Sequence, residues 1–308
     1  MSTTIDTAFI RQFRDAVVML AEQQTSRVKS AVNVIPVMGE MWDVERLGSI
    51  NASEITTRFE QIGRGDIAHT RRWGVVRGYD VRPLFLDSID KVKMLVRFES
   101  RYLRRLASAM ARAVDDTIIA ALDGPVTEGK TAGSTANFPS GTAGQDVFSF
   151  STGSTPGPLN LDTLLRAKAK LLGAEATESP NNPVTVLINS NAWLSLCQDN
   201  KFINLDFTRG AATLDTGELP PRLGMRFIRT ERLPDISDSN YDNGTPANRV
   251  FMFTRDAIDF GEAASIQADI TQRKDLRGYP WQVYTWGAWG AVRVEDVQVV
   301  RILAKKTT

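Results

Sequence analysis

Three stretches of this chain carry apolar side chains three or four residues apart, the spacing that gathers them on one face of an α-helix. They cover residues 7–32, about 88–122 and 161–176. Asp87 or Ser88 can cap the start of the second stretch, and Gly124 with Pro125 stops it. The pattern therefore predicts an N-terminal amphipathic helix, a long central helix and a shorter third helix.

Short runs of apolar residues predict strands in the second half of the chain. Pro183–Ile188 predicts a buried strand, and a short helix is expected at Ala192–Cys197. Residues 225–228 and 249–253 predict further strands, and residues 278–302 predict a closing β segment. Helices and strands mixed in this order indicate an α+β fold.

Residues 36–83 differ from the rest, because they hold many charges of both signs and few large apolar side chains. Val75, Val76 and Val81 favour β structure, and several glycines interrupt it. A segment this polar cannot form a core of its own, so we expect an extended hairpin or loop that rests on another surface. The Gly-, Ser- and Thr-rich residues 124–158 predict a surface loop or an irregular hairpin.

The composition is that of a globular chain, with 42% apolar and 24% charged residues among 308. Lys and Arg number 37 against 36 Asp and Glu, which argues against nucleic-acid binding through bulk charge. The apolar runs are too short to predict a signal peptide or a membrane span. A single cysteine, Cys197, excludes an intrachain disulfide and suits a reducing compartment.

Residue types needed for catalysis or metal binding are scarce. His69 is the only histidine, and it stands in the charged segment without a nucleophile motif. One histidine and one cysteine cannot complete a structural zinc site. Gly63–Ala68 has the letters of a dinucleotide motif without a βα unit, and Asp238–Asp242 begins like a calcium loop that lacks its glycine and glutamate. The sequence thus predicts no catalytic residue, no cofactor and no metal site.

Two other groups of side chains have both a chemical and a packing interpretation. Asp115 and Asp116 are neighbours on the predicted long helix, so they point in different directions and are expected to solvate its polar face. The aromatic residues Trp281, Tyr284, Trp286 and Trp289 can stack on bases. Because alternation along a strand places Trp281 on the opposite face from Tyr284 and Trp286, packing in a core or interface is favoured.

The one basic patch in the sequence lies on the predicted long helix. Between Lys91 and Arg112, seven Lys or Arg side chains oppose a single glutamate, Glu99. A solvated helix face and a face that binds phosphates or acidic neighbours both explain such a run. The sequence leaves these two interpretations open.

The closing segment carries the most informative sequence, with DLRGYP at 275–280, WGAWGAVR at 286–293 and VQVVRI at 297–302. Together with the charged helix at 102–122 and the strand and helix at 184–202, it resembles tailed-bacteriophage major capsid proteins of the Hong Kong 97-type fold. The resemblance is architectural and covers nearly the whole chain. It implies an α+β fold with an N-terminal arm, an extended loop, a peripheral domain with a long spine helix, and an axial domain.

The resemblance also implies a division of the chain into five segments. They are an N-terminal arm at 1–35, an extended loop at 36–85, a peripheral domain with the spine helix and the Gly-rich loop at 86–160, an axial domain at 161–275, and a return to the peripheral domain at 276–308.

As for function, the resemblance implies a structural protein rather than an enzyme, which self-assembles into pentamers and hexamers of an icosahedral phage head around double-stranded DNA. Its partners would be other copies of itself, packaged DNA held by non-specific contacts, and scaffolding, portal and decoration proteins, with no membrane. It would be located in the virion after assembly in the host cytoplasm. Two alternatives remain: an encapsulin-like compartment shell that holds cargo protein, and a soluble enzyme or binding module with a defined pocket.

Opposite charges in the extended loop can set the register between neighbouring subunits. We therefore expect subunit contacts from Arg58, Glu60, Arg64, Arg71 and Arg72. The helix face that carries Arg101, Arg104, Arg105 and Arg112 is expected to meet an adjacent subunit or packaged DNA.

Overall fold

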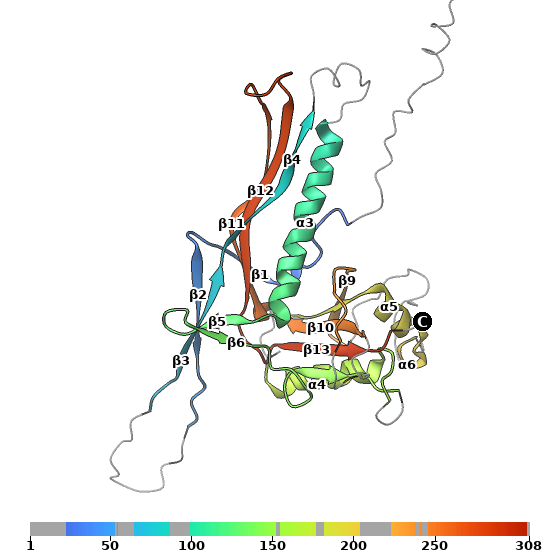
Figure 1. The fold of residues 1–308 in the computed structure, drawn as a ribbon. Coiled ribbons are helices and arrows are strands. Elements are labelled where there is room, and N and C mark those ends of the chain that lie inside the picture. Colours follow the sequence, from blue (N-terminus) through green and yellow to red (C-terminus); the bar gives the residue numbers. More distant parts are fainter. Residues whose placement is uncertain are drawn as a thin grey trace, which may run out of the picture. The chain divides into compact units, whose positions relative to one another are not determined.

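The computed structural model describes residues 23–52, 54, 65–86, 99–151, 155–176, 182–203, 223–237, 241 and 246–306. These residues form two compact units, whose elements are labelled in Figure 1. The smaller unit comprises the described parts of Met1–Thr25, Tyr79–Arg112 and Ile266–Gly287. The larger unit comprises those of Ser26–Gly78, Ala113–Ser265 and Ala288–Thr308.

The elements of the first half of the chain, within the described residues, are η1 (Lys29–Ala31), β1 (Asn33–Pro36), β2 (Met41–Leu47), β3 (His69–Val75), β4 (Arg77–Leu86), α3 (Glu99–Asp123), β5 (Val126–Glu128), β6 (Ser134–Ala136) and β7 (Asp146–Phe148). Those of the second half are α4 (Leu161–Gly173), β8 (Val184–Ile188), α5 (Ser190–Gln198), α6 (Asn200–Ile203), β9 (Met225–Arg229), β10 (Asn248–Thr254), η4 (Arg255–Ala257), β11 (Ile258–Gln272), β12 (Trp281–Arg293) and β13 (Val299–Ala304). The long helix predicted from about residue 88 is confirmed from Glu99 onward, and residues 87–98 lie outside the described ranges.

The larger unit is built around a mixed sheet with the strand order β7-β13-β10-β8-β9. β8 is antiparallel to β10, with Leu187 opposite Phe251, and parallel to β9, with Val186 opposite Phe227. All five residues of β8 are buried, as expected for a central strand covered on both faces. The buried strand predicted from the apolar run at 183–188 is therefore confirmed.

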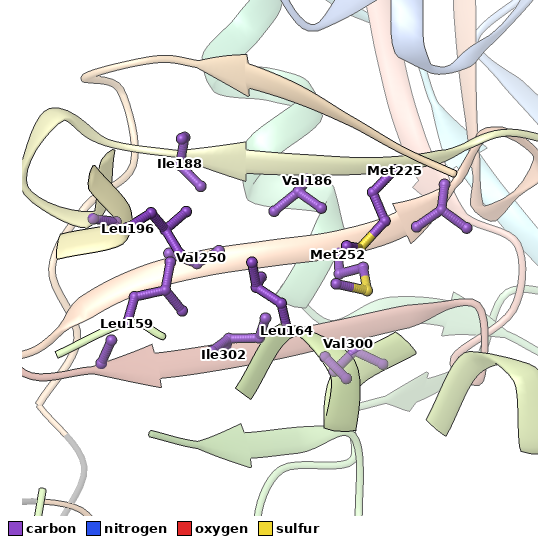
Figure 2. Close-up of a cluster of buried hydrophobic side chains, with 14 of the residues drawn as sticks. Leu159, Leu164, Val186, Ile188, Leu196, Met225, Val250, Met252, Val300 and Ile302 are labelled. Carbon is purple, nitrogen blue, oxygen red and sulfur yellow. The ribbon is translucent and has the colours of Figure 1, made fainter. Parts of the chain in front are cut away.

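Helices α4 and α5 complete the core of this unit. Leu164, Ala167 and Leu171 lie on one face of α4 and pack in a single buried cluster with side chains of β8, β10 and β13, as Figure 2 shows for Leu164. Asn160 and Asn189 cap α4 and α5, because each side chain accepts a hydrogen bond from a backbone N–H three residues on, at 2.9 and 2.8 Å. The helices predicted at 161–176 and 192–197 are both confirmed, with bounds shifted by a few residues.

A second sheet, β2-β3-β5-β6, carries the charged segment of the sequence. β2 and β3 are antiparallel over their whole length, from Met41 opposite Val75 to Leu47 opposite His69. The extended hairpin predicted for residues 36–83 is thus confirmed where the structure describes it. Residues 55–64, between these two strands, lie outside the described ranges.

The Gly-rich residues 124–158 contain more structure than the predicted loop. β5 and β6 form a short hairpin, with Val126 opposite Ala136, which agrees with the prediction. β7 does not agree, because it joins the mixed sheet parallel to β13 with Asp146 and Phe148 buried. A strand of three residues leaves no periodic pattern in the sequence, and its position depends on the partner strand.

The first part of β11 pairs with β1 in the larger unit, in parallel, with Asn33 opposite Asp259. The Asn33 side chain donates a hydrogen bond to the Asp259 carboxylate at 2.9 Å. In the smaller unit the turn between β11 and β12 is held by Arg273, whose N–H donates to the carbonyl of Pro280 at 2.9 Å. Hydrogen bonds from the Arg273 guanidinium lower the pKa of the Asp275 carboxyl to about 2.

The chain before β1 is not the helix that its spacing predicts, as far as the structure describes it. Asp115 of α3 is completely buried and accepts hydrogen bonds from the Ser26 hydroxyl at 2.6 Å and from the N–H groups of Arg27 and Val28 at 3.1 and 3.2 Å. These N–H groups are therefore committed to a carboxylate instead of a helical carbonyl, and only the three-residue turn η1 follows. The expected solvation of Asp115 was wrong, and residues 1–22 lie outside the described ranges.

Arg293, at the end of β12, caps the carboxyl end of α3. Its Nη1 donates hydrogen bonds to the carbonyls of Ala121, Leu122 and Gly124 at 3.3, 3.1 and 2.8 Å. These carbonyls have no partner within the helix, and they carry the negative end of its dipole. The side chain that satisfies these carbonyls is itself fully buried.

Asp296 joins this arginine to the hairpin. It accepts a hydrogen bond from Nε of Arg293 at 2.6 Å and two from the guanidinium of Arg72 at 3.0 and 2.7 Å. Arg72 also donates from Nε to Glu128 of β5 at 2.6 Å. Arg72, Arg293, Asp296 and Glu128 therefore form one hydrogen-bonded network in the larger unit. Only 1% of Arg72 is exposed.

A parallel set of ion pairs fastens β13 to its neighbours. Arg301 donates to both oxygens of Asp146 in β7 at 2.8 Å each, and it lies 3.3 Å from Asp123, which also binds Arg249 of β10 at 2.9 Å. The ring of Phe138 lies 5.2 Å from the guanidinium of Arg301 and from that of Arg293. The same aromatic ring thus contacts a guanidinium of each ionic group.

The network shifts the pKa of the Asp296 carboxyl. Burial by itself raises this pKa, but the hydrogen bonds from Arg72 and Arg293 and the charges of the two guanidinium groups outweigh burial, so the pKa lies below its ordinary value. Because the folded-state pKa is depressed, the ionised carboxylate stabilises the fold above about pH 4. This contribution is lost as the pH falls toward the folded-state pKa.

Trp42 of β2 packs the hairpin against the strands beneath it. A methyl group added to Gly74 of β3 would overlap the indole ring, one on Gly261 of β11 would lie 2.8 Å from it, and one on Gly290 of β12 would overlap the carbonyl oxygen of Val75. Three strands therefore carry glycine where the backbone must approach the ring or a neighbouring strand closely. The indole N–H is buried and has no hydrogen-bond partner among the described residues, so this contact depends on packing.

We expect Gly74→Ala to destabilise the larger unit by about 1–3 kcal/mol, the usual cost of an extra methyl group in a packed core. Urea unfolding followed by far-UV circular dichroism measures the change in the free energy of unfolding. Gly78→Ala is the matched control, because a methyl group on this glycine of β4 meets nothing within 4 Å. Equal stability of the two variants would contradict the close packing of Trp42.

Asp296→Asn is expected to lower the free energy of unfolding by about 3 kcal/mol near pH 6, because it leaves two buried guanidinium groups with one partner fewer. The difference from the wild-type chain should shrink as the pH falls below about 4, since the carboxyl then takes up a proton first in the unfolded chain and, at lower pH, in the folded chain. Urea unfolding at a series of pH values tests this, with the exposed Asp269→Asn as the control. A difference that stays constant with pH would show that the charge of Asp296 does not contribute.

Candidate functional site

Chemical groups of the kind that an active site needs are few in the described part of the chain. His69 is exposed on β3, and Cys197 is half-buried on α5, where burial raises the pKa of its thiol. No cluster of three His, Cys, Asp or Glu side chains that could hold a metal ion occurs among the described residues. Gly63 and Arg64 of the apparent dinucleotide motif, and most of the loop that resembles a calcium site, lie outside the described ranges.

The outward face of the hairpin is the most developed polar surface. Antiparallel pairing places Asp43 beside Trp73 and Glu45 beside Arg71. The Arg71 guanidinium pairs with Glu45 and with Asp43, the latter at 3.2 Å, and lies 5.7 Å from the ring of Trp73. The hydrogen bond to Glu45 is the main cause that raises the pKa of Arg71. This face therefore presents alternating charges held in a fixed order.

Apolar side chains flank these charges. Met38 is fully exposed, and Leu47 and Ile50 are 67% and 61% exposed. Met41 and Val75 form an exposed cross-strand pair at the other end of the hairpin. Apolar side chains gathered on one protruding element, rather than scattered, are typical of a protein contact surface.

Alternation along β3 separates two arginines that the sequence placed together. Arg71 points outward, whereas Arg72 points inward to Glu128 and Asp296. An interface role for Arg72 does not fit this burial, and its position is explained by the internal network. Arg58, Glu60 and Arg64 lie outside the described residues.

The basic face of α3 is described only in part. Arg104 is exposed and Arg105 is half-buried, while the side chain of Arg101 lies outside the description. Arg112 is half-buried, and its Nη1 donates a hydrogen bond to the carbonyl of Gln23 at 3.3 Å. The structure thus places Arg104 at the surface and ties Arg112 to the chain near its start.

A groove of about 570 Å³ lies beside the outward face of the hairpin. β3, β5 and β6 form most of it, and its lining consists of Glu45, His69, Thr70, Arg71, Glu128, Gly129, Lys130 and Ser134. These residues are polar or charged apart from the glycine, so the groove suits a polar chain segment better than an apolar ligand. Sequence reasoning missed it, because its residues come from segments about 60 positions apart.

None of the helices within the described ranges is both long enough and apolar enough to cross a lipid bilayer.

Comparison with solved structures identifies the architecture. The capsid protein of the cyanophage P-SCSP1u has a TM-score of 0.73 and 14% identity, with 100% of this chain and 96% of that chain covered. The capsid protein of the cyanophage Pam1 has a TM-score of 0.72 and 13% identity over 97% of each chain. A protein of the Mycobacterium phage Che8 has a TM-score of 0.69 and 19% identity over 96% of this chain and 97% of that one. These likenesses show a shared fold.

No curated protein matches the sequence. The sequence model of the phage capsid protein family matches residues 5–306, which is nearly the whole chain. This match confirms the Hong Kong 97-type α+β fold that the sequence suggested, and it agrees with the scarcity of catalytic groups. The chain belongs to the phage capsid protein family, and it is a structural protein of the phage shell.

Proposed function

We propose that this protein assembles through pentamers and hexamers into an icosahedral phage head that encloses double-stranded DNA. The observation that carries the proposal is the family match over residues 5–306, together with a fold that covers whole capsid chains of other phages. A closed shell repeats a small set of interfaces, so each subunit needs several complementary surfaces and no active site. The described surfaces of this chain fit that requirement.

Within this proposal, elements of the structure can be assigned to the predicted segments. The β2–β3 hairpin supplies the extended loop at 36–85, and α3 supplies the spine helix of the peripheral domain. We assign the mixed sheet with α4 and α5 to the axial domain. Because β7 and β13 are hydrogen-bonded into this sheet, the axial domain then extends beyond 161–275 to strands on both sides of it in the sequence.

The outward face of the hairpin is the proposed contact with adjacent subunits. Arg71 supports it from the described residues, and Arg58, Glu60 and Arg64 are proposed from the sequence of the same segment. Arg72 is assigned to the internal network instead. In this proposal Arg72 fixes the hairpin to the larger unit, and its neighbour Arg71 faces an adjacent subunit.

The basic face of α3, with Arg101, Arg104, Arg105 and Arg112, is proposed to meet an adjacent subunit or packaged DNA. The exposure of Arg104 supports this role. A chain with nearly balanced charge can hold DNA only through a local patch of this kind, and such contacts would be non-specific.

Further partners follow from the shell function. We propose scaffolding, portal and decoration proteins as partners, assembly in the host cytoplasm, and a role in the virion that needs neither catalysis nor a cofactor. A compartment that stores cargo protein would use the same fold, but the solved structures reported above are those of phages. The family match likewise gives no support to a soluble enzyme or binding module.

The purified protein is expected to form rings of five or six copies, tubes or closed shells as its concentration rises. Electron microscopy with light scattering detects these particles. Co-expression with the scaffolding protein of the same phage is the control for a chain that needs help to assemble. A chain that remains monomeric in both experiments would contradict the shell function.

Arg71→Glu is expected to weaken assembly while the subunit remains folded. Like charges placed together at a contact repel, so the protein concentration at half-maximal assembly should rise about tenfold, or about 1.4 kcal/mol per contact. The melting temperature should change little, because exposed ion pairs contribute little to stability. Arg77→Glu, on the exposed start of β4, is the matched control, and equal assembly of the two variants would remove Arg71 from the interface.

A further inference from the structure

One edge of β3 is left open inside the second sheet. β5 pairs with β3 only where Arg72 faces Glu128 and Trp73 faces Thr127. The chain then turns away at Gly129, whose φ of +101° is readily adopted only by glycine, and returns as β6. From Arg71 to His69, β3 therefore has β2 on one side and no strand of the described chain on the other.

The peptide groups on this open edge can be assigned from the ladder. In an antiparallel pair, successive residues direct their N–H and C=O groups to opposite sides. The N–H of Gly129 donates to the carbonyl of Arg71 at 3.1 Å, so Arg71 points its groups away from β2, whereas Ala68 accepts from Gly48 on the β2 side at 2.8 Å. His69 has the orientation of Arg71, so its N–H and C=O face the groove without a partner in the described part of the chain.

The carboxylates beside this edge have ion-pair partners among the described residues, whereas the lysine and the histidine do not. Within the described residues, Glu45 is paired with Arg71, and Glu128 is paired with Arg72 and Arg46. The ammonium group of Lys130 and the imidazole of His69 also line the groove, and the described residues supply no ion pair or hydrogen bond to either side chain. The groove therefore offers unpaired donors, while its carboxylates are already neutralised.

We propose that an extended segment of a second copy of this chain binds in the groove as an added strand beside β3. Its backbone pairs with the N–H and C=O of His69, and a carboxylate of the segment faces Lys130. The complementary charge favours an acidic segment, and the groove volume of about 570 Å³ suits a short peptide stretch. The inference rests on the proposed shell function, which brings copies of the chain together.

Strand addition is tested by comparing His69→Pro with His69→Ala. Proline removes the free N–H of residue 69, which β2 does not use, whereas alanine removes only the imidazole. The concentration at half-maximal assembly should rise about fivefold more for proline than for alanine, the effect of one ordinary hydrogen bond. Equal effects of the two variants would overturn the added strand, and circular dichroism verifies that both variants fold.

A photo-crosslinking residue at Ser134, on the rim of the groove, identifies the occupant. Illumination of assembled particles should give covalent dimers whose crosslinked peptide belongs to a second copy, and the dispersed subunit should give none. Crosslinks confined to one chain, or formed with a different protein, would overturn the proposal. This test does not depend on whether the proline variant folds.

These results separate the inference from the function on which it rests. If particles form and the groove remains uncrosslinked, the groove proposal fails and the shell function stands. If the wild-type chain forms no particles even with its scaffolding protein, the shell function fails, and the groove proposal fails with it.

Discussion

The buried guanidinium of Arg293 is the contact on which the larger unit depends. It satisfies three carbonyls at the carboxyl end of α3 and binds Asp296, which in turn holds Arg72 of the hairpin. Helix α3, the end of β12 and the β2–β3 hairpin are thus joined through one carboxylate and two arginines. Because both guanidinium groups are buried, the loss of Asp296 leaves each of them with fewer partners.

The side chains that fix the hairpin to the larger unit lie on one face of it, and those at the surface lie on the other. Inward side chains of the hairpin, Trp42, Arg46 and Arg72, fix it to the body of the larger unit through packing and hydrogen bonds. Outward side chains such as Arg71 remain at the surface. A strand with alternating faces allows both tasks within seven residues. The proposed contact surface would thus be presented by a strand pair that is already in position.

The groove beside β3 follows from a small local cause. β5 contains only three residues, and its turn at Gly129 ends the ladder early. An unpaired strand edge is a risk for a soluble protein, since it invites pairing with other chains. In a protein of the phage capsid family, the proposed strand addition would use this edge, and the charged side chains beside it would favour an acidic partner segment.

The sequence by itself determined the class of fold, the helices at α3, α4 and α5, the strands β8, β9 and β10, and the hairpin, because each leaves a local periodic or apolar pattern. The family resemblance was stated on the closing segment at 275–302, the long helix at 102–122, and the strand and helix at 184–202. The sequence did not determine that Asp115 and Arg72 are internal, that residues 23–32 form no α-helix, that β7 joins the sheet, or that a groove exists. Those features depend on partners far away in the chain, and only the tertiary structure decides whether a charged residue finds a buried partner or remains in water.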